Sequence, residues 1–156
     1  MQELLWQEYK KIEKSLFLVA LGYLHNTEDA KDAVGDAVLA ACQSFGRLKK
    51  REYFKTWMTR IVINKSKDIL RKRRTTEELT DNLNVFYDMP EADFDIMDAI
   101  CRLEPGQAVY ITLRFYNDMT YDEVARLKKL PVSTVKYRTK KALEELKRIL
   151  EGDVLG

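Results

Sequence analysis

The sequence is poor in residues that break or cross-link a chain, with three prolines, six glycines, two cysteines and one histidine among 156 residues. Few helix breakers and no long alternating apolar run predict an all-α protein rather than one with a sheet. No apolar run is long enough to span a bilayer, and the segment MQELLWQEYKKIEK lacks a signal-peptide core. We therefore expect a cytoplasmic protein with no membrane insertion.

The few cysteines and the lone histidine also limit the chemistry. Cys42 and Cys101 form no CxxC pair, so we expect two inert buried thiols rather than a disulfide framework. His25 lies in a predicted turn between helices, where a solvated loop residue is a better interpretation than a catalytic base. The sequence has no Gly-rich phosphate loop, nucleophile elbow or clustered metal ligands. We predict that it is not an enzyme, with no catalytic residue, metal, cofactor or small-molecule substrate.

Charge is abundant but unevenly distributed. Residues 1–74 carry 16 Lys/Arg and 9 Asp/Glu, residues 75–101 carry 8 acids and no Lys or Arg, and residues 102–156 carry 11 bases and 8 acids. The net charge of only +2 conceals this order. The pattern predicts two basic folded pieces joined by an acidic connector.

Three helices are predicted in the first piece. Apolar residues at three-to-four spacing indicate a helix over about 2–23, and Asn26 is a suitable N-cap for a second helix that ends near Phe45. A third helix over about 52–74 has an apolar stripe opposite a basic face. Residues 47–74 carry 12 basic and 2 acidic residues, and their mutual repulsion favours nucleic acid as a partner over a merely solvated face.

The acidic connector precedes a second helical piece. Residues 75–94 lack sustained periodicity, and a flexible coil of that length spans roughly 25 Å. Four helices are predicted after it, over about 95–103, 105–116, 121–128 and 132–150. The fold class is therefore all-α, with two small helical domains joined by an acidic linker.

The segment MTYDEVARLKKLPVSTVKYRTKKAL (119–143) has the pattern of a helix-turn-helix. Thr120 and Glu123 predict a capping box at the start of its first helix, and Pro131 opens the second. In this motif the second helix enters the major groove of DNA, and its N-terminal residues meet base edges. The exposed side chains suited to bind bases or phosphates are Ser133, Thr134, Lys136, Tyr137, Arg138, Lys140 and Lys141.

Together the two pieces resemble one protein family. Residues 9–74, with NTEDAKDAVGDAVLAA (26–41) and YFKTWMTRIVINKSKDILRKRR (53–74), resemble the promoter-melting domain of the extracytoplasmic-function (ECF) sigma factors of bacterial RNA polymerase. Residues 96–150, with RLEPGQAVYITLRFYNDMTYDEVARLKKLPVSTVKYRTKKALEEL (102–146), resemble their helix-turn-helix domain.

The resemblance implies a subunit that recognises promoters, melts DNA and starts transcription with core RNA polymerase. It implies a region 2-like domain over 1–74, an acidic linker over 75–95 that threads into the RNA path of the polymerase, and a region 4-like domain over 96–156. The helix from Val132 would bind the minus-thirty-five element. The implied partners are core RNA polymerase, promoter DNA and an anti-sigma factor.

The resemblance also implies roles for residues of the first domain. Residues docking on the clamp helices of the polymerase would be Asp29, Asp32, Asp36 and Leu39. Residues holding the unwound minus-ten strand would be Lys49, Lys50, Arg51, Phe54, Trp57, Asn64, Lys67 and Arg71. By spacing alone, however, Phe54 and Trp57 fit the apolar stripe of their helix better than a base-binding role, and Asn64 and Asp68 fit a helix-surface pair.

Two other functions fit part of the chain. A stand-alone helix-turn-helix regulator would explain residues 102–150 but leaves the first domain and the connector without a role. A helical module that only binds proteins would show no dependence on DNA or salt.

The chain also departs from the family pattern: Lys129 replaces the usual glycine of the turn, Gly35 replaces a glutamine, and Cys42 replaces a tryptophan.

Overall fold

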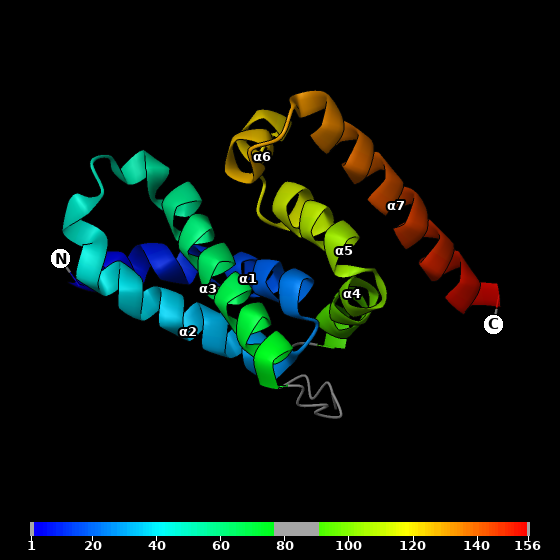
Figure 1. Ribbon diagram of the computed structural model, residues 1–156, viewed down its shortest axis with the longest axis horizontal. Coiled ribbons are helices and arrows are strands. Elements are labelled where there is room, and N and C mark those ends of the chain that lie inside the picture. Colours follow the sequence, from blue (N-terminus) through cyan, green and yellow to red (C-terminus); the bar gives the residue numbers. More distant parts are fainter. Residues whose placement is uncertain (1, 77–90, 156) are drawn as a thin grey trace.

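The computed structural model describes residues 2–76 and 91–155, and all regular structure in these two ranges is helical (Figure 1). The helices form two groups, one on either side of residues 77–90. None of the helices in the described ranges is both long and apolar enough to cross a membrane. The bounds are α1 Gln2–Leu24, α2 Thr27–Ser44, η1 Phe45–Arg47, η2 Arg51–Tyr53, α3 Phe54–Thr76, α4 Glu91–Arg102, α5 Pro105–Ile111, η3 Thr112–Tyr116, α6 Tyr121–Lys128 and α7 Val132–Leu155.

The first group confirms the three helices predicted before the connector. Helices α1, α2 and α3 pack against one another around buried apolar side chains that include Leu16, Ala33 and Met58. The third helix differs slightly from its predicted bounds, because the short 3₁₀ turn η2 occupies residues 51–53 and α3 begins at Phe54.

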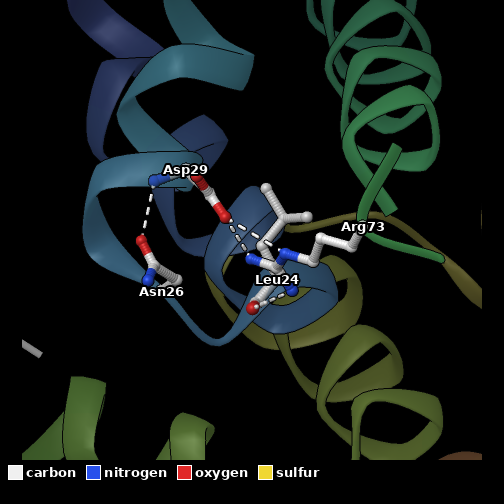
Figure 2. Close-up of polar contacts among 4 residues, drawn as sticks. All are labelled: Leu24, Asn26, Asp29 and Arg73. Carbon is white, nitrogen blue, oxygen red and sulfur yellow. Dashed lines mark hydrogen bonds and ion pairs between the residues drawn. The ribbon is translucent and has the colours of Figure 1, made fainter. Parts of the chain in front are cut away.

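The turn between α1 and α2 is held by a set of polar contacts that Figure 2 shows. Asn26 caps α2 as predicted, since its Oδ1 accepts a hydrogen bond from the Asp29 amide at 2.9 Å. The Arg73 guanidinium, from the last turn of α3, pairs with the Asp29 carboxylate and donates to the Leu24 carbonyl at 3.0 Å. All three helices of the group are therefore tied together at this end.

The second half of α1 is buried on every side. All nine residues from Leu16 to Leu24 are buried, with α2 and α3 on one flank and α4, α5 and η3 on the other. Gly22 lies at a close approach to the second group, because a Cβ atom there would lie 3.2 Å from Thr112 Oγ1. The two groups of helices therefore share one continuous apolar core.

Hydrogen bonds between polar side chains also link the two groups of helices. Asn117, which is fully buried, donates from Nδ2 to Thr59 Oγ1 at 2.9 Å, and its Oδ1 accepts from the Ser15 hydroxyl at 3.0 Å. Nearby, Lys128 Nζ donates to the Tyr23 hydroxyl at 3.1 Å. Because buried polar groups are costly unless they are hydrogen-bonded, these contacts specify one way for the groups to pack.

The second group contains the predicted helix-turn-helix. The Thr120 hydroxyl accepts from the Glu123 amide, and the Glu123 carboxylate accepts from the Thr120 amide, both at 3.1 Å, which confirms the capping box. Lys129 adopts the left-handed conformation with φ of 57°, and the Leu130 amide donates to the Ala125 carbonyl at 3.0 Å. The turn thus has the left-handed helix end that glycine usually forms, with a lysine in the glycine position.

Several expectations meet a different structure. The predicted linker falls largely on residues 77–90, which lie outside the described residues, while α4 already begins at Glu91. The helix predicted over 105–116 widens after Ile111 into the π-helical turn η3, in which the Asn117 amide donates to the Thr112 carbonyl at 2.9 Å.

The expectation that both thiols are buried is wrong, and so is the expectation that His25 is a solvated loop residue. Cys42 is exposed, whereas Cys101 is half-buried, and burial followed by the nearby Asp98 raises its pKa to about 11. His25 has φ of 53°, and its buried Nε2 has no hydrogen-bond partner in the described part of the chain. Burial and then the Arg73 guanidinium lower the pKa of His25.

The left-handed lysine of the turn generates a stability prediction. Lys129→Gly should raise the free energy of unfolding by roughly 0.5–1 kcal/mol, because glycine adopts this conformation without the Cβ clash. Urea denaturation of the full chain measures it. Lys140→Gly, at an exposed position inside α7, is the matched control and should lower stability by about 1 kcal/mol. A Lys129→Gly variant no more stable than the native chain would contradict the strain argument.

His25 generates a prediction about pH. Since its pKa is lowered in the folded protein, the unfolded chain binds more protons, and stability should fall as the pH drops below about 6.5. His25→Asn removes the titrating group, and asparagine tolerates the left-handed conformation. Thermal melts between pH 7.5 and 5 should show the native chain losing stability relative to this variant. Parallel losses in the two proteins would show that His25 does not contribute.

Candidate nucleic-acid interface

The second helix of the helix-turn-helix, α7, presents the predicted polar face to solvent. Its inner face is buried through Val135, Thr139 and Ala142, which fixes the rotation of the helix. Among the predicted reading residues, only Thr134 is half-buried. The exposed ones are Ser133, Lys136, Tyr137, Arg138, Lys140 and Lys141.

Three cations of this face rest on tyrosine rings. Lys136 Nζ lies 5.9 Å from the centroid of the Tyr121 ring, and Lys141 Nζ lies 5.6 Å from that of Tyr137. The Arg138 guanidinium lies 6.0 Å from the Tyr110 ring centroid and donates to the Tyr110 hydroxyl at 3.0 Å. Tyr110 and Tyr121 belong to α5 and α6, and no local spacing rule connects them to α7, so the sequence alone does not identify them.

The basic face of the first group lies on α3 and on the loop before it. Its predicted polar members are all exposed and belong to one continuous stretch of chain: Lys49, Lys50, Arg51, Asn64, Lys67 and Arg71. The helix-surface pair that the structure forms is Asp68 with Arg71 rather than with Asn64. Arg73, in contrast, turns inward to Asp29 and Leu24, so it stabilises the bundle (Figure 2).

The aromatic residues of this stretch divide into buried and exposed ones. Phe54 is only 3% exposed, and it packs with Trp57 and Phe45 at centroid separations of 6.0 and 6.3 Å. This placement is the core position that spacing favoured, and Trp57 remains half-buried beside it. Tyr53, directly before Phe54, is 56% exposed, with Lys50 Nζ 6.0 Å from its ring centroid. It is the open aromatic surface beside the basic loop.

The predicted docking residues lie along α2. Asp32, Asp36 and Leu39 are exposed, with 65% of the Leu39 surface open to solvent. Asp29 is half-buried and paired with Arg73, so part of its charge is neutralised within the bundle. Partial burial, followed by the carboxylates of Asp29, Asp36 and Glu28, raises the pKa of Asp32. The exposed face of α2 is therefore acidic around an apolar point.

The described residues contain no group of three or more His, Cys, Asp or Glu side chains arranged to hold a metal ion. The features that stand out are instead three separate surfaces. The acidic face is on α2, one basic face is on α3 and its preceding loop, and the other basic face is on α7. Such charged faces are suited to bind polyanions and an oppositely charged protein surface.

Comparison with known proteins accounts for both groups of helices. The family described as Sigma-70 region 2 matches residues 9–76, and Sigma-70, region 4 matches residues 93–146. The two matches together cover most of the chain. Since the first group has its own match, nothing favours a stand-alone regulator that would leave it without a role.

Curated relatives and solved structures agree with these matches. The sigma factor SigV of Bacillus subtilis is 26% identical over 85% of this chain and 82% of its own length. The sigma-H factor of Pseudomonas aeruginosa is 25% identical over 90% and 83%. In fold, the chain is similar to the sigma factor RpoE of Bartonella quintana, solved with the anti-sigma factor NepR, at a TM-score of 0.79, 19% identity, and coverage of 97% of this chain and 98% of that one. It is also similar to CnrH, solved with the cytosolic domain of CnrY, at a TM-score of 0.68 and 22% identity over 98% and 91% of the two chains.

Both sigma-70 regions thus occur in order within one short all-helical chain, alongside relatives of the ECF class such as SigW of Bacillus subtilis. The chain therefore belongs to the extracytoplasmic-function sigma factors of the sigma-70 family, transcription-initiation factors that direct RNA polymerase to promoters.

Proposed function

We propose that the three exposed surfaces divide the work of initiation between them. The observation that carries this proposal is their separation: the acidic face and the two basic faces occupy different helices, so one polypeptide can bind polymerase and DNA together. In this scheme, the region 2-like domain spans residues 1–74 and the region 4-like domain spans residues 96–156. The acidic linker over 75–95 follows the RNA path, where its negative charge keeps it off the DNA.

The α2 face is the docking surface for core RNA polymerase. Asp32 and Asp36 supply negative charge that attracts a basic partner surface, and Leu39 supplies the apolar contact that is buried on binding. Asp29 acts mainly through its pair with Arg73, which holds α2 against α3 and so orients the docking face.

The basic loop and the outer face of α3 hold the separated minus-ten strand. Binding a single strand requires cations along the backbone and aromatic surface for unstacked bases. Lys49, Arg51 and Lys67 supply the first, and Tyr53 supplies the second. Phe54 supports this surface from the core, and the half-buried Trp57 packs beside Phe54. A base taken out of the duplex costs a few kcal/mol, which these contacts offset.

The N-terminal half of α7 reads the minus-thirty-five element in the major groove. Lys136, Arg138 and Lys141 reach base edges and phosphates, while Ser133 and Thr134 make shorter contacts near the start of the helix. The relatives solved with NepR and CnrY support a further partner, an anti-sigma factor, which would cover these surfaces until initiation is required. The protein acts in the cytoplasm, where polymerase and DNA are found.

Run-off transcription tests the proposal as a whole. Purified bacterial core polymerase is incubated with and without the protein on fragments of its own genomic neighbourhood. A start site that depends on the protein is expected, and its upstream sequence defines both promoter elements. No transcript and no comigration with core polymerase would overturn the assignment of the three surfaces.

The docking surface gives the first prediction about function. Leu39→Asp should weaken binding to core polymerase by about tenfold or more, because a buried apolar contact at an interface is replaced by a charge that stays hydrated. Comigration of labelled protein with core polymerase measures the affinity. Leu150→Asp is the matched control, since Leu150 is also an exposed helical leucine and lies outside the proposed surface. Equal losses in the two variants would remove Leu39 from the interface.

The basic face of α3 gives the second. Arg71→Gln should reduce promoter opening several-fold and lower the salt slope of DNA binding by about one, while polymerase binding stays unchanged. Permanganate footprinting of unpaired thymines measures opening. Arg148→Gln is the matched control, because Arg148 also pairs with a carboxylate three residues earlier on an exposed helix. Loss of polymerase affinity in step with opening would contradict the division of roles.

A further inference from the structure

Arg138 differs from the other cations of the α7 face in how it is held. Lys136 only lies near a tyrosine ring, and Lys141 lies near one and pairs with the Glu144 carboxylate at 3.6 Å, whereas Arg138 Nη1 donates to the neutral Tyr110 hydroxyl at 3.0 Å. An arginine on an exposed helix face ordinarily samples many rotamers, and ordering one costs entropy when it binds DNA. A hydrogen bond and a ring together restrict the guanidinium before DNA arrives.

The tyrosine that holds Arg138 is itself fixed. Tyr110 is 3% exposed and belongs to the apolar core around α5. On the same ring, Lys128 Nζ lies 5.8 Å from the centroid, and that amine is bound to the Tyr23 hydroxyl of α1. A ring packed in the core cannot swing with the side chain that rests on it, so Tyr110 is a rigid support for Arg138.

The chemistry of this support leaves the charge of Arg138 available. A guanidinium has five N–H donors, of which the phenol oxygen accepts one. In the described part of the chain no carboxylate forms an ion pair with Arg138, unlike Arg73 and Arg148, whose charges are neutralised by acids. A neutral acceptor therefore orients the group without cancelling the charge that a guanine edge or a phosphate attracts.

We propose that Tyr110 is a positioning residue for base recognition, and that its hydroxyl orients the Arg138 guanidinium toward the minus-thirty-five element. The inference rests on the proposed function, since it takes α7 as the reading helix. It adds a residue that is buried in α5 and never touches DNA to the set that determines promoter specificity.

A double-mutant cycle on the full chain bound to core polymerase tests the inference, using a promoter found by run-off transcription. Tyr110→Phe keeps the ring and removes the hydroxyl. It should reduce discrimination between the native and base-substituted minus-thirty-five element by about threefold to tenfold, the worth of one hydrogen bond. Its salt slope should stay that of the native chain, because no charge is lost. Once Arg138→Ala is present, Tyr110→Phe should have no additional effect.

The possible outcomes distinguish failure of the role proposed for Arg138 from failure of the role proposed for Tyr110. If Arg138→Ala leaves discrimination unchanged, Arg138 does not read the element, and that part of the proposed function fails. If Arg138→Ala reduces discrimination but Tyr110→Phe has no effect, or has an effect that adds fully in the double variant, the role of Tyr110 is overturned. Tyr9→Phe, which removes the hydroxyl of a buried tyrosine in α1, controls for loss of packing.

A second variant keeps the test decisive if Tyr110→Phe folds poorly by thermal melting. Arg138→Lys retains the charge but loses the planar fork that the Tyr110 hydroxyl orients. Reduced discrimination with an unchanged salt slope is the expected result. Full discrimination with lysine would show that a point charge suffices at this position. Orientation of the side chain by Tyr110 would then not contribute to base recognition.

Discussion

Helix α1 is the constraint on which both groups of helices depend, because its second half is part of each core. The nine residues from Leu16 to Leu24 are buried without a solvent-facing side, and a helix that is apolar all round must be covered all round. Helices α2 and α3 cover one flank, and α4, α5 and η3 cover the other. The close approach at Gly22 and the buried Asn117 then select the register of the second group.

Acidic and basic side chains lie on different helices around this shared core. Each exposed surface with a proposed role lies wholly or partly on a helix whose opposite face is apolar, so the sign of its charge does not depend on the packing of the core. The pair between Asp29 and Arg73 shows the limit of that independence (Figure 2). It takes one acid from the proposed docking face and one base from α3, which carries the proposed DNA-binding face, and uses them to hold α2 and α3 together.

Local signals in the sequence predicted the helices well and the contacts between distant residues poorly. Asn26, Thr120 and Glu123 act within one turn of chain, so their caps were correctly predicted. Lys129 was flagged as a departure from glycine, and it does adopt the left-handed conformation. In α1, the apolar residues Phe17, Leu18 and Leu21 are too many for one apolar stripe beside Leu16 and Val19, and they were a signal for burial on a second side. The pairs Arg138–Tyr110 and Lys128–Tyr23 join residues 28 and 105 positions apart, and no periodicity predicts them.

More cations rest on aromatic rings on the α7 face than on the α3 face, and this difference matches the nucleic acid that each is proposed to bind. On α7, Lys136, Arg138 and Lys141 rest on aromatic rings. On the other basic face, Lys50 lies near the Tyr53 ring and Arg71 pairs with Asp68, whereas Lys49 and Lys67 form no hydrogen bond or ion pair with the described part of the chain. Duplex DNA presents base edges at fixed positions, so a reader gains from cations whose positions are already set. A separated strand has no fixed shape, and mobile cations can follow its backbone wherever the bases stack.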